Sequence, residues 1–295
     1  MRRIFLCIPF WLVACDHAVD DQKPVGGHTD TEAEVQRYVR RAYLDLSGRP
    51  PSDADLNATT TRLRDANNTA ATRASFVDER IATDDYAKVW VEELENGILG
   101  GNTLEQQYAF ICAIVRGQDR SCDSCTQQDS CKCACGILPT LDTERTDLMK
   151  TTADFKSNMP TSDIERRYAM AFGYYALSGS PEGRTSALFD DFLSRPAEPD
   201  EIENGRAMII GALFPPAPAG LLFHRLGASY ADVIDIVFHS EVYREALVRR
   251  VFNRYLAREP SSAELAFFTP TLDANAPDAR KLIHAVVSSR EYFEQ

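Results

Sequence analysis

Cysteines are the residues of this chain whose type and spacing could support chemistry. Eight occur in 295 residues, and five of them crowd the polar segment SCDSCTQQDSCKCACG. Thiols at this density form disulfides in an oxidising compartment, bind Zn²⁺ or Cu(I), or exchange electrons as a redox pair. The five cysteines of this segment are Cys122, Cys125, Cys131, Cys133 and Cys135.

Disulfide bonding is the interpretation we favour for this cluster. With Cys112 it contains six thiols, an even number, which permits three bridges in fifteen arrangements. Cysteines separated by one residue seldom bond to each other, so Cys131, Cys133 and Cys135 are expected to have different partners. Cys112, on a helix expected at 103–116, would attach the segment to the helical body.

Two alternatives stay open from the residues alone. The thiolates from Cys122 to Cys135 could hold a metal ion, although they lack the paired Cys-x2-Cys motifs of a zinc ribbon. Cys122 and Cys125 could be a redox pair, although no βαβ pattern surrounds them. The favoured interpretation assigns the protein no metal and no cofactor.

The first fifteen residues are typical of a bacterial lipoprotein. Two arginines precede an apolar stretch that is shorter than the roughly 20 residues that span a bilayer. The stretch ends in LVAC, which resembles a lipobox, where a signal peptidase cuts before a cysteine that receives lipid. We therefore expect a signal peptide at 1–14, lipidation at Cys15 and a flexible tether within 15–31. A plain signal peptide with an incidental cysteine is the alternative.

Net charge and expected localisation together restrict the classes of binding partner. Lys and Arg number 32 against 44 Asp and Glu, so the formal net charge is −12. Nucleic-acid phosphates need clustered basic residues, which argues against nucleic acid as a partner. We expect the protein to be lipid-anchored in the cell envelope, on the inner or the outer membrane, and to contact another envelope protein.

Apolar residues recur at helical spacing along most of the chain, and no segment of useful length alternates like a strand. The sequence predicts an all-α, irregular helical bundle with a Cys-rich disulfide loop. Serines at 52, 162 and 261 are expected to cap helices, the last two with Glu165 and Glu264. Helices are expected from 35 to 46 and near 72–82, 85–97, 103–116, 162–177, 200–212, 229–241, 243–256, 262–272 and 277–293.

A motif recurs three times in the sequence. Each copy has an arginine just before the start of one helix and ends with a tyrosine on a later helix, which we call the closing helix. It predicts two to three related helical units, at 32–100, 161–243 and 244–295, with 101–160 as a Cys-rich insertion. The motif arginines are Arg49, Arg195 and Arg258, and the closing tyrosines are Tyr86, Tyr243 and Tyr292.

These repeated residues are expected to maintain the fold. A guanidinium binds a carboxylate bidentately, so each arginine should pair with a closing acid, which is Asp85, Glu241 or Glu291. Helix-end carbonyls are further possible partners. The alternative is an anion or glycan site that recurs in each unit. The tyrosines lie at helical spacing with Leu and Val, which favours core packing.

Both ends of the chain resemble known bacterial domains. The strings LGASYADVIDIVFHSEVYREALVRR, VRRVFNRYLAREPSSAEL and VVSSREYFEQ resemble the DUF-four-two-one-four domain, which occurs in repeats in secreted and surface-attached proteins. RRAYLDLSGRPPSDADL and FVDERIATDDYAKVW resemble the opening of the DUF-fifteen-forty-nine domain. These resemblances imply a helical architecture and no established reaction. The second family often accompanies haem domains, but the chain contains no Cys-x-x-Cys-His.

Catalytic motifs are missing from the sequence. The five histidines form no metal-ligand spacing, and Gly179–Gly183 has the wrong order for a nucleophile elbow and is interpreted as a turn. The sequence predicts a non-enzymatic, membrane-anchored helical scaffold or protein-interaction module of the bacterial envelope. The alternative is a thiolate metal-binding or redox accessory protein that uses the Cys122–Cys135 cluster.

Overall fold

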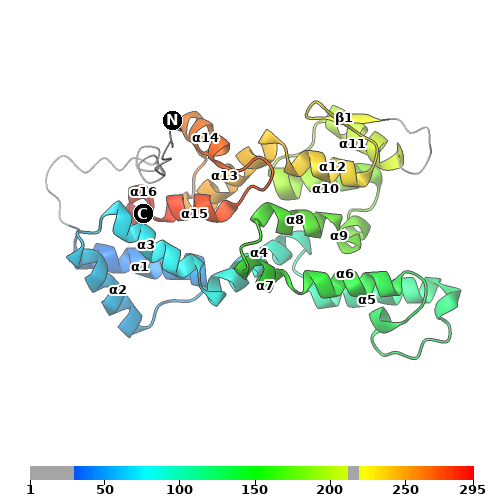
Figure 1. The fold of residues 1–295 in the computed structure, drawn as a ribbon, viewed down its shortest axis with the longest axis horizontal. Helices are drawn as coiled ribbons and strands as arrows, with labels where there is room; N and C mark the ends of the chain where they lie inside the picture. The colour runs from blue at the N-terminus through cyan, green and yellow to red at the C-terminus, as the bar shows by residue number, and fades with distance from the viewer. Residues whose placement is uncertain (1–29, 212–218) are drawn as a thin grey trace, which may run out of the picture.

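A computed structural model describes residues 30–211 and 219–295, and nearly all of its regular structure is helical (Figure 1). The all-α prediction is confirmed. The expected signal peptide, Cys15 and nearly all of the tether lie outside the described residues. Within the described ranges no helix is both long and apolar enough to cross a membrane.

The first helix of the N-terminal unit, 32–100, has strong local signals at its start and at its end. Thr31 and Glu34 form a capping box, in which each side chain accepts the backbone N–H of the other residue. Gly48 closes the helix with φ of +65°, and a Cβ there would lie 2.9 Å from Val89 Cγ2. The helices of this unit are α1 (Glu32–Ser47), α2 (Asp53–Asp65), α3 (Ala70–Ile81) and α4 (Asp84–Ile98).

Two antiparallel helices project from the body as an arm (Figure 1). The Cys-rich segment connects them at the far end of the arm. Helix α6 was not expected from the sequence, because polar residues separate its buried Leu138, Leu141 and Leu148. The arm consists of α5 (Leu104–Gln118), η2 (Arg120–Cys122), η3 (Ser130–Lys132) and α6 (Leu138–Leu148), and α7 (Thr151–Lys156) follows it.

In the middle of the chain the structure differs from two predictions of secondary structure. The helix expected at 162–177 is interrupted, because Ala171 has an extended backbone with ψ of 141°. The segment interpreted as a turn at Gly179–Gly183 starts a helix, with Ser180 as its cap and Pro181 in its first turn. The helices here are α8 (Thr161–Met170), α9 (Phe172–Leu177), α10 (Pro181–Leu193), α11 (Pro199–Gly211) and α12 (Tyr230–Phe238).

A short hairpin lies between α11 and α12, although no strand was expected. Strands β1 (Gly220–Leu222) and β2 (Arg225–Gly227) pair antiparallel, with Leu221 opposite Leu226. Phe223 and His224 form the turn, and both have positive φ. Strands of three residues are too short for an alternating pattern to stand out in the sequence.

The two ends of the described chain pack together in one lobe. Tyr38 of α1 donates a hydrogen bond to the Val287 carbonyl at 3.3 Å, and Arg290 pairs with Asp30 at 2.8 Å. Phe76 and Phe293 also pack against the Tyr38 ring. The last elements are α13 (Glu241–Leu256), α14 (Ser262–Phe268), η4 (Thr269–Thr271), α15 (Ala279–Val287) and α16 (Arg290–Glu294).

Each copy of the repeated motif begins and ends on a helix of the structure. Helices α1–α4, α10–α13 and α13–α16 each contain one copy of the motif, so α13 closes one copy and opens the next. The expected boundary between residues 243 and 244 falls inside this helix. A residue with positive φ precedes each motif arginine: Gly48 at +65°, Ser194 at +53° and Ala257 at +52°.

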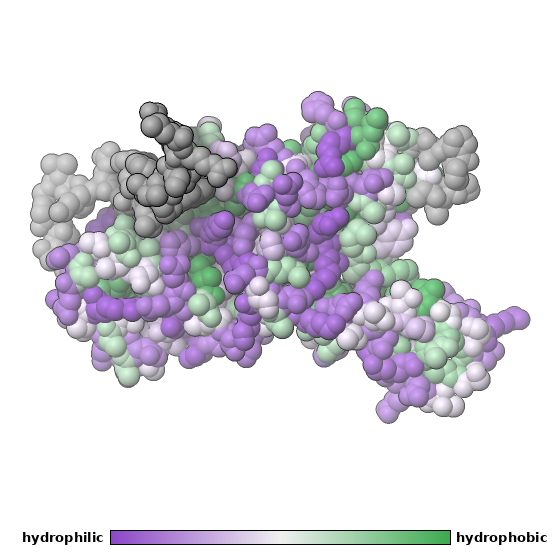
Figure 2. Space-filling view, viewed as in Figure 1, coloured by the Kyte–Doolittle hydropathy of each residue, from purple (hydrophilic) through white to green (hydrophobic). Residues whose placement is uncertain are grey.

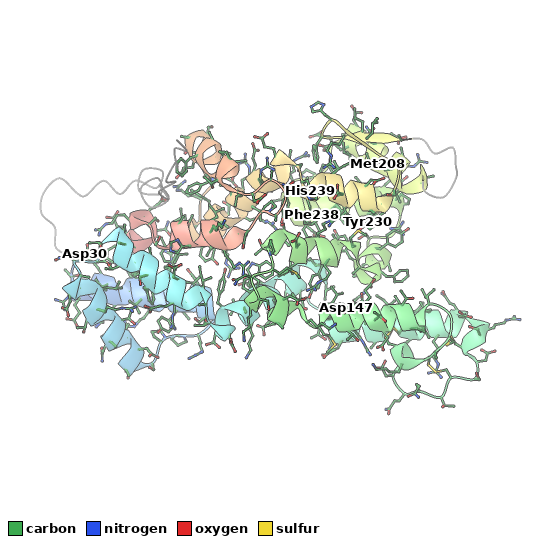
Figure 3. All side chains as sticks on the ribbon, in the orientation of Figure 1. Asp30, Asp147, Met208, Tyr230, Phe238 and His239 are labelled. Atoms are coloured by element: carbon green, nitrogen blue, oxygen red, sulfur yellow. A yellow bond between two sulfur atoms is a disulfide. The ribbon has the colours of Figure 1, made fainter. Side chains whose placement is uncertain are left out.

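Aromatic side chains form much of the core. Phe238 lies between Phe192 and Tyr243, with ring centroids 5.0 and 4.8 Å away. Figure 3 shows Phe238 and Tyr230 at the two ends of α12, and Asp147 where the arm meets the body. The buried side chains of the body and of the arm form one continuous cluster.

Candidate functional site

All six cysteines of the predicted disulfide set are paired. Cys112–Cys131, Cys122–Cys135 and Cys125–Cys133 have Cα–Cα distances of 5.1, 5.3 and 5.8 Å, within the range for disulfides. As expected, the three cysteines spaced by single residues have different partners. Cys112 fixes the Cys-rich segment to α5, as the sequence also predicted.

Polar contacts within the arm also constrain the Cys-rich segment. The carboxylates of Asp119 and Asp129 accept the backbone N–H groups of Ser121 and Cys131 at 2.9 and 3.0 Å. Arg116 donates to the Cys125 carbonyl at 2.5 Å. These contacts, together with three disulfides, constrain both ends and the middle of the segment.

The pairing bears on the alternative uses of the cluster. A disulfide sulfur is not a thiolate, and the thiolate is the form that binds metal or attacks another disulfide. The described ranges contain no group of three or more His, Cys, Asp or Glu side chains placed to hold a metal ion. Metal binding by this cluster would therefore first require reduction of these bonds. The redox pair considered from the sequence, Cys122 with Cys125, is not formed, because Cys122 is bonded to Cys135 and Cys125 to Cys133.

The outer face of α5 carries an apolar stripe that the sequence did not predict. Phe110 is 63% exposed and Ile114 is 43% exposed, one helical turn apart. We call this surface the α5 stripe. Its exposed members follow a spacing of three and four residues: Gln106, Ala109, Phe110, Ala113, Ile114 and Gly117.

The opposite face of α5 is occupied by the arm itself. Tyr108, Ile111 and Cys112 are buried, and the Tyr108 hydroxyl donates to Glu144 of α6. Burial, followed by this hydrogen bond, raises the pKa of Tyr108 well above its ordinary value. Glu144 also accepts the Phe172 N–H at 2.8 Å, which connects the arm to α9. The inner face therefore orients α5 and leaves the α5 stripe outward.

An open groove of about 550 Å³ lies where the arm meets the body. Glu144 and Arg167 line this groove, and both have partners within the chain. Glu144 accepts hydrogen bonds from Tyr108 and Phe172, and Arg167 pairs with Asp154 at 2.6 Å. Asp147 pairs with Lys150 at 2.7 Å. The groove thus contains charged groups that already have partners.

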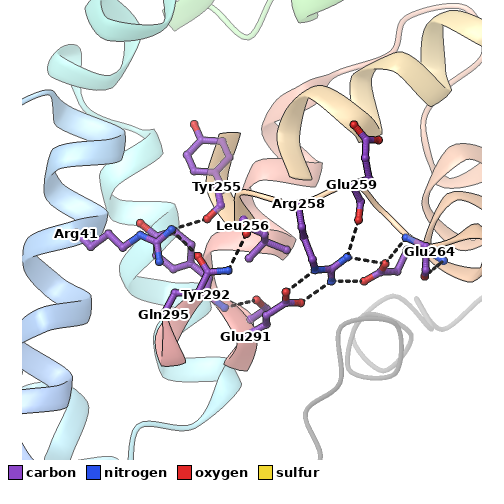
Figure 4. A network of polar contacts seen from close by, with 11 residues as sticks. Arg41, Tyr255, Leu256, Arg258, Glu259, Glu264, Glu291, Tyr292 and Gln295 are labelled. Carbon is purple, nitrogen blue, oxygen red and sulfur yellow. Dashed lines mark hydrogen bonds and ion pairs between the residues drawn. The ribbon is translucent and has the colours of Figure 1, made fainter. Parts of the chain in front are cut away.

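The motif arginines occupy equivalent places but do not all have equivalent partners. Arg49 pairs with Asp85 at 2.6 Å, which is the closing acid of its own unit. Arg258 binds Glu291 at 2.5 and 2.6 Å and also binds Glu264 (Figure 4). Both pairings match the expectation from the sequence.

Arg195 differs from the other two arginines. It binds both oxygens of Glu201, at 2.8 and 2.7 Å, and not the expected Glu241. Glu201 lies six residues after Arg195, as Glu264 lies six residues after Arg258. Arg195 therefore keeps the contact with the start of the next helix. The interpretation of these arginines as anion sites is weakened, because each guanidinium is already paired with a carboxylate of the chain.

The closing tyrosines share one local role. Each lies three residues after a capping Thr or Ser that accepts its backbone N–H, and each is at most 1% exposed. Their hydroxyls differ: Tyr243 donates to Glu165 at 2.9 Å and Tyr292 to Asp45 at 2.6 Å. The Tyr86 hydroxyl is buried with no hydrogen-bond partner among the described residues.

Glu165 corrects another expectation from the sequence. With Ser162 it was expected to cap a helix, but α8 starts at Thr161 without a side-chain cap. Glu165 is instead 4% exposed and binds Arg250 at 2.9 Å as well as Tyr243. This pairing spans about eighty residues, so no local spacing signal could have indicated it.

Comparisons with protein-family models, with curated proteins and with solved structures found no match for this chain. The resemblance to the two bacterial domain families therefore stays a prediction from the sequence.

Proposed function

We propose that the protein is a lipoprotein of the bacterial envelope, anchored at Cys15, that works as a non-enzymatic helical scaffold. Its arm would be the element that contacts another protein. Three disulfides support an oxidising compartment, in which such bonds form and persist. The lipobox-like LVAC string supports a lipid anchor, which holds a protein to a membrane without a spanning helix.

The α5 stripe is the observation that carries the proposed interaction role. Contiguous apolar surface on a soluble protein marks interaction sites. Phe110 and Ile114 are exposed side by side on one helix face. Figure 2 shows a mainly white and green area on the arm, among purple hydrophilic residues.

The construction of the arm suits this role. A binding surface that is ordered before contact loses less conformational entropy when a partner binds. The Cys112–Cys131 bridge and the Tyr108–Glu144 contact fix α5 from its inner face. The arm projects from the body (Figure 1), and Phe110 and Ile114 of the α5 stripe are exposed to solvent.

Crosslinking in native membranes followed by purification of this protein tests the proposal. Ala113→Glu places a charge in the middle of the α5 stripe, and Ala58→Glu makes the same change on an exposed face of α2. We expect Ala113→Glu to lose a crosslinked protein that the wild type and Ala58→Glu retain. Equal crosslinked products from all three proteins would contradict the interaction role of the arm.

The anchor needs a separate test. Metabolic labelling with radioactive palmitate should label the wild-type protein, and Cys15→Ser should abolish the label. A labelled Cys15→Ser variant, or an unlabelled wild type, would contradict lipidation at this residue.

A further inference from the structure

We propose that the partner of the α5 stripe is a second copy of this chain, with the two α5 helices packed antiparallel about a twofold axis. The axis would pass beside the midpoint between Ile111 and Cys112. This inference rests on the proposed role of the arm and names its partner. An antiparallel pair of identical helices is an isologous contact, which closes after two copies.

The sizes of the side chains in the α5 stripe support this register. Rotation about the proposed axis places Phe110 opposite Ala113 of the second copy, and Ile114 opposite Ala109. It also places Gln106 opposite Gly117. Each large exposed residue thus meets a small exposed one, which is the condition for interdigitated packing of two helices.

Gly117 is not explained by the single chain. A Cβ at this position would meet nothing within 4 Å, so nothing within the described chain requires a glycine here. Glycine in the interior of a helix costs about 1 kcal/mol relative to alanine, and Gly117 lies in the last turn of α5. In the proposed dimer its missing side chain leaves room for Gln106 of the second copy.

Charge favours the antiparallel arrangement over a parallel one. The α5 stripe contains no charged residue, while Glu105 lies in the first turn of α5 and Arg116 in the last turn. Antiparallel packing places each Glu105 near the end of the other helix that carries Arg116, and it opposes the helix dipoles. Parallel packing in register would separate Glu105 from Arg116 of the other copy and place Phe110 against Phe110.

Sedimentation of the mature chain from residue 15, with Cys15→Ser to remove the lipid acceptor, tests the dimer. One helix face per copy is a small interface, so we expect a reversible dimer at about 100 µM protein. Phe110→Ala and Ala113→Phe should each weaken dimerisation roughly tenfold or more. Their melting temperatures should stay close to that of the parent, because both positions are exposed.

The double variant Phe110→Ala with Ala113→Phe tests the register. In the antiparallel dimer it again places a large residue opposite a small one, so it should restore dimerisation. Failure of the double variant to recover would overturn the antiparallel register, and a dimer unaffected by the single variants would overturn the α5 stripe as its contact. A monomeric parent would overturn the homodimer. A crosslinked protein of another kind, lost in Ala113→Glu, would then still support the proposed interaction role.

Discussion

Arg258 and Glu291 are joined by two hydrogen bonds, from Nε to Oε1 at 2.5 Å and from Nη2 to Oε2 at 2.6 Å. The same guanidinium donates to both oxygens of Glu264 and lies 5.1 Å from the centroid of the Phe252 ring (Figure 4). One side chain therefore connects the end of α13, the start of α14 and the final helix, α16.

Replacing this arginine should destabilise the protein measurably. Arg258→Ala leaves the partly buried Glu264 and Glu291 without their shared partner, and we expect a loss of about 1–3 kcal/mol. Arg49→Ala is the matched control, because Arg49 is 64% exposed and exposed pairs contribute at most about 1 kcal/mol. Thermal unfolding of both variants checks this, and equal melting temperatures for wild type and Arg258→Ala would contradict it.

The closing tyrosines give a second, internally controlled prediction. Tyr243→Phe removes a buried hydrogen bond to Glu165 and should cost about 1–2 kcal/mol. Tyr86→Phe removes a buried hydroxyl that has no partner among the described residues, so it should be neutral or stabilising. Urea unfolding of the two variants measures the difference, and a larger loss in Tyr86→Phe would show that these contacts are assigned wrongly.

Acid should weaken the Arg258 network through Glu264. Burial would raise the pKa of Glu264, but hydrogen bonds from Arg258 and from Ser261 hold it at about 2, below its ordinary value of 4.5. A carboxyl whose pKa falls on folding contributes stability that is complete above pH 4.5 and lost as the pH drops toward 2. Glu264→Gln should therefore show a smaller loss of stability between pH 5 and pH 2 than wild type. Identical pH profiles would exclude this carboxyl as a source of acid sensitivity.

The disulfides predict a chemical and a thermodynamic result. Purified, unreduced protein should contain none of the six thiols in alkylatable form, and peptides should be linked as Cys112–Cys131, Cys122–Cys135 and Cys125–Cys133. Replacing both Cys112 and Cys131 by alanine should cost about 3 kcal/mol, mainly because the unfolded chain loses a constraint. Six reactive thiols in the native protein would contradict the pairing and return the cluster to the metal and redox alternatives.

The sequence was sufficient for features that depend on local spacing. Gly48 before a proline pair indicated the end of α1, because glycine readily adopts a positive φ there. The even number of cysteines indicated disulfide bonding. Their single-residue spacing indicated that Cys131, Cys133 and Cys135 do not bond to one another. The Arg258–Glu291 contact followed from the repeated motif, since equivalent residues of a repeat occupy equivalent places.

The α5 stripe could not be predicted in the same way. Helix α5 has apolar residues on both faces, with Tyr108, Ile111 and Cys112 on one and Phe110 and Ile114 on the other. Periodicity cannot indicate which face is buried, because the answer depends on α6 and on the Cys112–Cys131 bridge. The partner of Glu165 was likewise set by tertiary contact alone.

The most direct test of the interaction role of the arm is photo-crosslinking in intact cells. A photoreactive phenylalanine analogue would replace Phe110 on the arm and, as a control, the 49% exposed Leu44 of α1. We expect a protein adduct from position 110 and none of that size from position 44. An adduct from position 44 alone, or from neither position, would contradict the claim that the arm is the contact element of this protein.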